Sequence, residues 1–324
     1  MKTYSWSPLE DLFKNIELAG GFVNAHAHLD RAYTVTRDMM DLTKNHLYEK
    51  WKLVDEIKKL RTKADYKDDI TIALRAQRDI GVTTICSFID IDSVVGTKAI
   101  DGAELARNTV PGIKALYACQ TLKGVLDQEN YNLINSRIDC FDIIGSLPGA
   151  DKNKEAEHLD VVMMMAKKHG KMLHVHVDQL NHPDEKETEL LCRKTIEYGL
   201  EGRVAAVHSI SLACHPKHYR DEVYRMAKDC GMMFISCPTA WIDHPRNNQL
   251  MPFHNAVTPA DELLEHGLTV AIGSDNIHDI YKPYADGDMK TELRFLLETC
   301  KIYDSEQLKN VATVSGLKVC GIIK

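Results

Sequence analysis

A chain of 324 residues can bury a large hydrophobic core, as one large domain or as two of average size. Its formal charge of −7, with acidic residues interspersed among basic ones, argues against nucleic acid as a partner, because nucleic-acid-binding proteins present a basic face. No apolar run approaches the ~18 residues that a membrane span needs, and the first residues have no apolar leader pattern. We therefore expect a cytoplasmic protein that binds neither membranes nor nucleic acid.

The nine cysteines include no C-x-x-C pair. Cys86, Cys119 and Cys237 lie in apolar, strand-like runs, where free cysteine behaves as a small hydrophobic residue. This usage is typical of a reducing compartment and indicates no thiolate metal site.

Short apolar runs alternate along the chain with longer amphipathic stretches, which is the pattern of βα units around a parallel sheet. Helical patterning is clearest over residues 155–169, which end at Gly170, over 183–200, which open with Pro183, and over 286–300. The expected strands are residues 21–27, 83–90, 114–120, 141–147, 171–177, 203–209, 232–238 and 268–274.

Eight strands of this kind predict an α/β fold, the closed (β/α)₈ or TIM barrel. An open doubly wound sheet is the competing architecture, but no glycine-rich phosphate loop follows the first strand. We expect a single domain over residues 1–324, with a helical insertion at about 35–75 over the barrel mouth.

Histidines and acids stand at the ends of several expected strands, where a barrel builds its active site. His26 and His28 are two residues apart, so both side chains point to the same face of the first strand and could chelate one ion. His208 ends the sixth strand, and Asp275 follows the eighth, where a buried carboxylate is costly unless it is paired or bound to a cation.

The fifth strand repeats the two-residue spacing with His174 and His176, and Asp178 continues the same face. Imidazoles together with a carboxylate suit zinc or iron(II), with one position open for water. Such an ion lowers the pKa of a bound water toward ~7 and so supplies hydroxide at neutral pH.

This pattern resembles the amidohydrolase superfamily, and within it the bacterial cytosine deaminases and their relatives, which include the isopropylammelide amidohydrolases. The likeness is carried by GGFVNAHAHLDRAYT (20–34), DIGVTTICSFIDID (79–92), LHVHVDQ (173–179) and GSDNIHDIYKPYADGDM (273–289). It implies one divalent ion, zinc or iron, held by His26, His28, His176 and Asp275.

The resemblance also assigns further roles. Asp275 would be the general base, and His208 would polarise the substrate or hold the hydroxide. His174 matches a position that does not bind the metal. Gln120 and Tyr281 match substrate-binding positions, the glutamine through a looser alignment.

Two departures from the resembled group concern the proton-transfer residues. Gln179 replaces a glutamate that shuttles a proton, and Asn276 replaces a second acid. An amide cannot act as an acid or base near neutral pH, so we expect both to bind substrate, with Asp275, helped by Asp178, moving protons. We expect most or all of the accessory β-sandwich of these deaminases to be absent, because only about 20 residues precede the first expected strand. The fourth strand ends without a lysine that could bridge two metals, which favours one ion.

The sequence therefore predicts a metal-dependent hydrolase of a C–N bond in a small nitrogen heterocycle, of deaminase or N-alkyl amidohydrolase type. Hydrolysis of a cyclic amide or lactone without ammonia release is a second hypothesis. A catalytically inactive ligand-binding barrel is a third, and Gln179 is the feature that favours it. We expect a small-molecule substrate as the partner. The sequence does not determine the oligomeric state and is compatible with a homo-oligomer.

Overall fold

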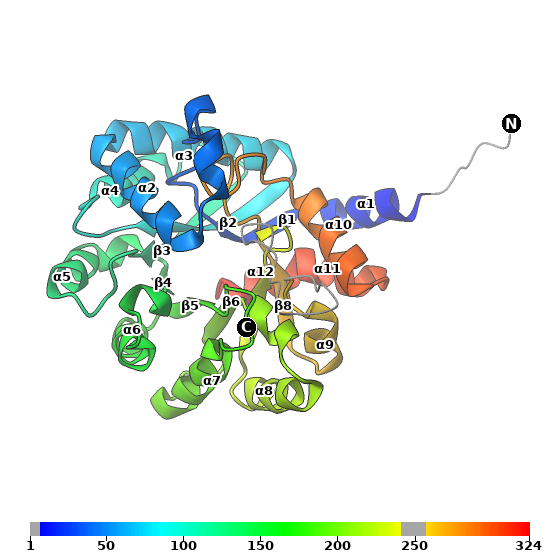
Figure 1. The fold of residues 1–324 in the computed structure, drawn as a ribbon. Coiled ribbons are helices and arrows are strands. Elements are labelled where there is room, and N and C mark those ends of the chain that lie inside the picture. Colours follow the sequence, from blue (N-terminus) through cyan, green and yellow to red (C-terminus); the bar gives the residue numbers. More distant parts are fainter. Residues whose placement is uncertain (1–6, 241–256) are drawn as a thin grey trace, which may run out of the picture.

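Eight parallel strands form one sheet in the computed structural model, which describes residues 7–240 and 257–324. The strands follow sequence order around the sheet, and a parallel bridge between Ala27 and Asp275 links its last edge to its first (Figure 1). The predicted barrel and its eight strands are confirmed, and none of the strands falls in the undescribed ranges. The strands are β1 Phe22–Ala27, β2 Val82–Asp90, β3 Lys114–Gln120, β4 Ile143–Ser146, β5 Met172–Val177, β6 Val204–His208, β7 Met233–Ser236 and β8 Thr269–Ile272.

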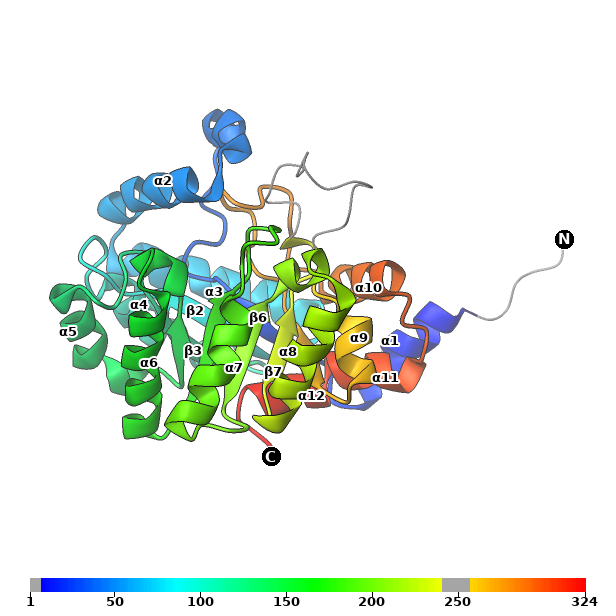
Figure 2. The ribbon, with the colours of Figure 1, turned by 60° about the horizontal axis from the view of Figure 1, so that its bottom comes forward.

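Helices surround this sheet and alternate with its strands (Figures 1 and 2). No helix of the described ranges combines the length and the apolar character that a bilayer crossing requires. The α-helices are α1 Pro8–Leu18, α2 Leu47–Leu60, α3 Lys63–Asp79, α4 Lys98–Ala106, α5 Gln128–Ser136, α6 Glu155–His169, α7 Glu187–Tyr198, α8 Lys217–Asp229, α9 Ala260–Glu265, α10 Met289–Cys300, α11 Ser305–Ala312 and α12 Val314–Val319. Short 3₁₀ helices are η1 Arg37–Lys44, η2 Ile138–Cys140, η3 Pro148–Asp151 and η4 Ile210–Cys214.

The segment expected as an insertion over 35–75 divides into two parts. Helix η1 and helix α2 stand above the ends of the strands, as Figure 2 shows, and α2 contributes side chains to the central cavity. Helix α3 instead packs against β2 and α4, as one of the helices around the barrel. The part of the segment over the mouth is therefore η1 and α2.

Local sequence explains where helices α6 and α7 begin and end. Helix α6 has Glu155 and Glu157 in its first turn and ends at Gly170, whose φ of 66° is readily adopted by glycine. The prediction that the next helix opens at Pro183 is wrong, because α7 begins at Glu187. The residues before it form an ordered loop, in which the Leu180 backbone N–H donates to the Glu185 carboxylate at 2.6 Å.

Candidate active site

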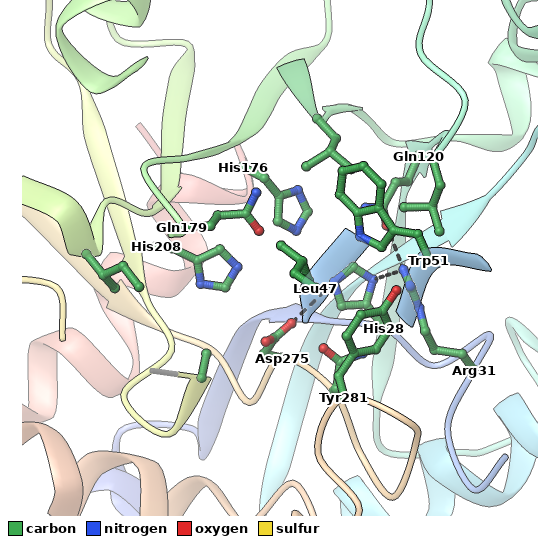
Figure 3. A pocket seen from close by; sticks show the side chains of 15 residues that line it. His28, Arg31, Leu47, Trp51, Gln120, His176, Gln179, His208, Asp275 and Tyr281 are labelled. Atoms are coloured by element: carbon green, nitrogen blue, oxygen red, sulfur yellow. Dashed lines mark hydrogen bonds and ion pairs between the residues drawn. The ribbon is translucent and has the colours of Figure 1, made fainter. Parts of the chain in front are cut away.

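Four histidines and one aspartate meet at the carboxyl ends of the strands. Figure 3 shows His28, His176, His208 and Asp275 of this group. His26 and His28 come from β1, His176 from β5 and His208 from the end of β6, and Asp275 follows β8. The ligand atoms of His26, His28 and His176 lie within 4.8 Å of one another, as do those of His26, His208 and Asp275. Asp275 Oδ1 is 3.4 Å from His26 Nε2 and 3.3 Å from His28 Nε2. Residues from four strands thus surround one point.

The backbone at these strand ends is unusual. His208 has φ 75° and Asp275 φ 58°, left-handed values that are strained for residues other than glycine. Gly273, two residues before Asp275, allows the end of β8 to lie against β1, since a Cβ there would come within 2.6 Å of the His26 carbonyl oxygen. The close approach lets the Asp275 backbone N–H donate to that same carbonyl oxygen at 3.0 Å.

The chemical state of these side chains fits a divalent metal ion. Burial lowers the pKa of His26, His28 and His208 to about 4, so the imidazoles are neutral near pH 7, which is the form that binds metals. Burial alone would raise the pKa of Asp275, but the close approach of the His26 and His28 imidazoles outweighs it and holds that pKa well below its usual range.

His26 provides the test of whether a metal fits. Its side chain is fully buried, and neither ring nitrogen has a hydrogen-bond partner among the described residues. Buried polar atoms are nearly always paired, and a metal ion would satisfy one of these nitrogens. His176 is also arranged to bind a metal. Its Nδ1 lies 3.2 Å from the Ser146 carbonyl oxygen and can donate to it, which leaves Nε2 free to bind an ion.

His174 and Asp178 lie apart from this cluster. His174 lies deeper in the barrel interior, where its Nε2 is 2.8 Å from the carbonyl oxygen of Val319 at the end of α12. The prediction that Asp178 continues the same face is wrong. It has φ 52°, and its carboxylate accepts the backbone N–H groups of Glu187 at 2.7 Å and Thr188 at 3.2 Å. Because Asp178 caps the start of α7, it is not placed to help Asp275 move protons.

A cavity of about 60 Å³ opens beside the cluster of four histidines and Asp275, and we call it the inner chamber. Gln120, Gln179, Asn276 and Tyr281, which the sequence proposed as substrate-binding residues, all line it. A second, outer cavity of about 540 Å³ adjoins the chamber, and Leu47, Trp51 and Gln179 line both.

Two residues of the chamber wall, Arg31 and Trp51, were not proposed from the sequence. Trp51 and Leu47, both of α2, line the chamber, and Figure 3 shows their side chains beside His28. Arg31 follows the H-x-H pair by three residues, and this position in the AHLDR run was the available signal for it. For Trp51 the sequence offers no comparable signal, because its place depends on how α2 folds over the barrel.

Arg31 connects the histidine–aspartate cluster to the chamber wall. Its Nη2 lies 2.8 Å from His28 Nδ1 and 2.9 Å from Gln120 Oε1. A guanidinium only donates, so His28 Nδ1 accepts here and the ring proton is on Nε2. A metal held by His28 Nε2 would require the ring proton on Nδ1 instead, where it could not accept from Arg31. The bond from Arg31 to Gln120 does not depend on this tautomer.

Phe88 of β2 packs against the histidines from the barrel interior. Its ring centroid is 4.8 Å from that of His26 and 4.6 Å from that of His176. The ring fills the space beside both imidazoles, which excludes water from this side and holds their orientation. From the sequence, Phe88 was expected only as part of the strand over residues 83–90.

Comparisons with known proteins agree with this arrangement. The model of the amidohydrolase family matches residues 34–308. A Haemophilus influenzae protein of uncharacterized function is 44% identical over 250 residues, which is 76% of this chain and 91% of the relative. N-isopropylammelide isopropyl amidohydrolase of Pseudomonas sp. is 26% identical over 316 residues, covering 94% of this chain and 75% of that enzyme.

Solved structures show the same fold. The 5-methylcytosine deaminase of Klebsiella pneumoniae with 5-fluorocytosine has a TM-score of 0.86 at 22% identity, over 93% of this chain and 75% of that one. N-isopropylammelide isopropylaminohydrolase of Burkholderia multivorans has a TM-score of 0.75 at 18% identity, over 93% and 74% of the two chains. The protein is a hydrolase acting on carbon–nitrogen bonds other than peptide bonds. With most of its length matched by the family model, the chain belongs to the amidohydrolase family.

Proposed function

We propose that the protein hydrolyses a C–N bond in a small nitrogen heterocycle, with release of ammonia or an amine, at one divalent ion held by His26, His28, His176 and Asp275. The observation that carries the proposal is the buried convergence of these four side chains beside a chamber lined by three carboxamides. Their nitrogen and oxygen donors suit zinc or iron(II). When bound, such an ion supplies Lewis-acid activation of water and substrate.

Asp275 is the proton carrier of this proposal. Its Oδ1 faces the Nε2 atoms of His26 and His28, while its Oδ2 accepts no hydrogen bond from the described residues and is available to take a proton. The carboxylate removes a proton from the attacking water and returns it to the departing nitrogen, as a general base and then a general acid.

His208 and Gln179 act on the substrate in this scheme. His208 is neutral near pH 7, because burial lowers its pKa to about 4, so it can donate one hydrogen bond to an oxygen or nitrogen beside the reacting carbon. Gln179 lines the chamber and offers one donor and one acceptor group. In Figure 3 its carboxamide lies on the same side of the chamber as His176 and His208.

Metal analysis combined with a substrate panel tests the proposal. We expect about one zinc or iron ion per chain and release of ammonia or amine from at least one member of a panel of pyrimidines, purines, triazines and pterins. Asp275→Asn should abolish turnover, because it removes both an anionic ligand and the base. Asp286→Asn is the matched control, since Asp286 is an exposed aspartate that follows in the same loop.

The possible results separate the hypotheses. Full activity of thoroughly metal-stripped protein would contradict the proposal. Ring opening without ammonia or amine release would favour a cyclic amide or lactone hydrolase. Metal binding with no turnover of any ring class would favour an inactive ligand-binding barrel.

A further inference from the structure

Carboxamides usually give no information about ligand polarity, because either end can face a ligand once the side chain rotates. The inner chamber is lined by three of them, from Gln120, Asn276 and Gln179. For two of the three, a buried charged neighbour determines which end is already occupied.

Gln120 is fixed by Arg31. Its Oε1 accepts a hydrogen bond from Arg31 Nη2 at 2.9 Å, and both residues are buried. Arginine has only donors, so the atom of Gln120 that faces it must be the oxygen. Arg31 is held in turn by Asp30 and Asp90, with Nε–Oδ1 and Nη2–Oδ1 distances of 3.8 Å and 3.5 Å. The Nε2 group of Gln120, which has no partner among the described residues, is therefore left to donate into the chamber.

Asn276 is fixed in the opposite sense by Asp279. Its Nδ2 donates to Asp279 Oδ2 at 2.5 Å. The other oxygen of Asp279 accepts the backbone N–H groups of Tyr281 at 2.9 Å and Lys282 at 3.1 Å, so this carboxylate acts as an acceptor on both sides. The Oδ1 atom of Asn276 accepts no hydrogen bond from the described residues and is left as an acceptor for the chamber.

We propose that this pair determines the substrate class: the ring presents a hydrogen-bond acceptor to Gln120 and a hydrogen-bond donor to Asn276. Rings with a lactam or cyclic amidine edge meet this requirement, through a carbonyl oxygen or ring nitrogen at Gln120 and an N–H or NH₂ at Asn276. Gln179 has no such fixed end and adapts to either polarity. The inference rests on the proposed function, because it takes the inner chamber as the substrate site.

The test makes the same amide-to-acid change at each position in turn. Calorimetry then measures how tightly the metal-loaded protein binds pyrimidin-4-one. Gln120→Glu should weaken binding about 10-fold, because a carboxylate facing Arg31 has no donor for the chamber. Asn276→Asp should change binding less than about 3-fold, because the acceptor is kept. Gln128→Glu is the control, since Gln128 is an exposed amide on α5.

A second measurement covers the possibility that an acid at position 276, next to Asp279, disturbs metal binding. The N3-methyl derivative of the probe lacks the ring N–H. Methylation should weaken binding to the wild-type protein about 10-fold and should have little effect in Asn276→Ala, where the partner acceptor is gone.

Arg31 acts in this proposal as a positioning residue through Gln120. Arg31→Met as a single substitution should weaken binding of the probe. In a Gln120→Ala background the same substitution should change the affinity less than about 2-fold. A purely structural role of Arg31 would give the same loss in both backgrounds.

The opposite pattern, with Gln120→Glu tolerated and Asn276→Asp damaging, would overturn the assignment, as would equal effects at both positions. Failure of the wild-type protein to bind pyrimidin-4-one while it hydrolyses another ring would also overturn it. Probe binding with the expected pattern but no turnover of any ring would support the assigned polarity and contradict the proposed hydrolysis instead.

Discussion

Replacing Lys58 should show most clearly how much more a buried ion pair contributes to stability than an exposed one. It lies in the last turn of α2, and its Nζ is 2.8 Å from Asp90 Oδ2 and 2.7 Å from Asp92 Oδ2. The exposed fractions of Lys58, Asp90 and Asp92 are 3%, 1% and 0%. Burial would lower the pKa of this lysine, but the two carboxylates outweigh it and raise the pKa, so the ammonium stays charged.

Lys58→Met keeps most of the aliphatic stem and removes the charge that compensates two buried carboxylates. Breaking a buried pair in this way typically destabilises a protein by about 3–5 kcal/mol, because an uncompensated charge remains in the interior. We expect a loss of that size in the free energy of unfolding. The same change should raise KM, since α2 also carries Leu47 and Trp51 over the inner chamber.

The neighbouring lysine supplies the control. Lys59 pairs with Glu56 at 2.6 Å, but its side chain is 56% exposed, so Lys59→Met should leave the free energy of unfolding almost unchanged. Adding Asp92→Asn to Lys58→Met should recover about 1 kcal/mol or more, because it removes the carboxylate that is left without a cation, while Asp90 still has Arg31 at 3.5 Å. Urea denaturation followed by circular dichroism measures all three variants. Equal, small losses for Lys58→Met and Lys59→Met would refute the reasoning.

Three further predictions concern the metal, the chamber and the loop before α7. His176→Ala should lose the metal while His174→Ala keeps it, which metal analysis decides; retention in the first and loss in the second would reverse the assignment. Gln179→Glu should weaken turnover of the native substrate, because a carboxylate cannot donate the amide's hydrogen bond, and the wild-type protein should deaminate cytosine negligibly; efficient cytosine deamination would place the proton shuttle elsewhere. Burial and the nearby charge of Asp178 raise the pKa of Glu185 from 4.5 to about 7 despite a hydrogen bond from Ser211. The folded chain therefore keeps a proton that the unfolded chain loses, so stability should fall as pH rises from about 4.5 to about 7. Glu185→Gln should flatten this dependence in urea titrations across that range, and an unchanged slope would contradict the assigned shift.

The sequence by itself was sufficient for the features that depend on local periodicity. Each strand is a short apolar run between helical stretches, and all eight predicted strands lie within a few residues of those observed. The two-residue spacing of His26 and His28 places both on one face of a strand whatever the rest of the chain does. Because barrel strands all end at the same rim, the terminal positions of His176, His208 and Asp275 also predicted that these side chains would meet.

Contacts between distant segments were decided only by the tertiary structure. Asp178 fits the alternation of β5, yet the chain turns at a left-handed residue there and gives its carboxylate to the start of α7. Arg31 and Gln120 are 89 residues apart, and Trp51 reaches the chamber only because α2 folds over the strand ends. Side-chain periodicity specifies which face of an element a residue occupies, but not which charged group from another element it will meet. The meeting of the candidate metal ligands could therefore be predicted from strand ends, whereas the polarity of the chamber wall depends on partners that only the folded chain brings together.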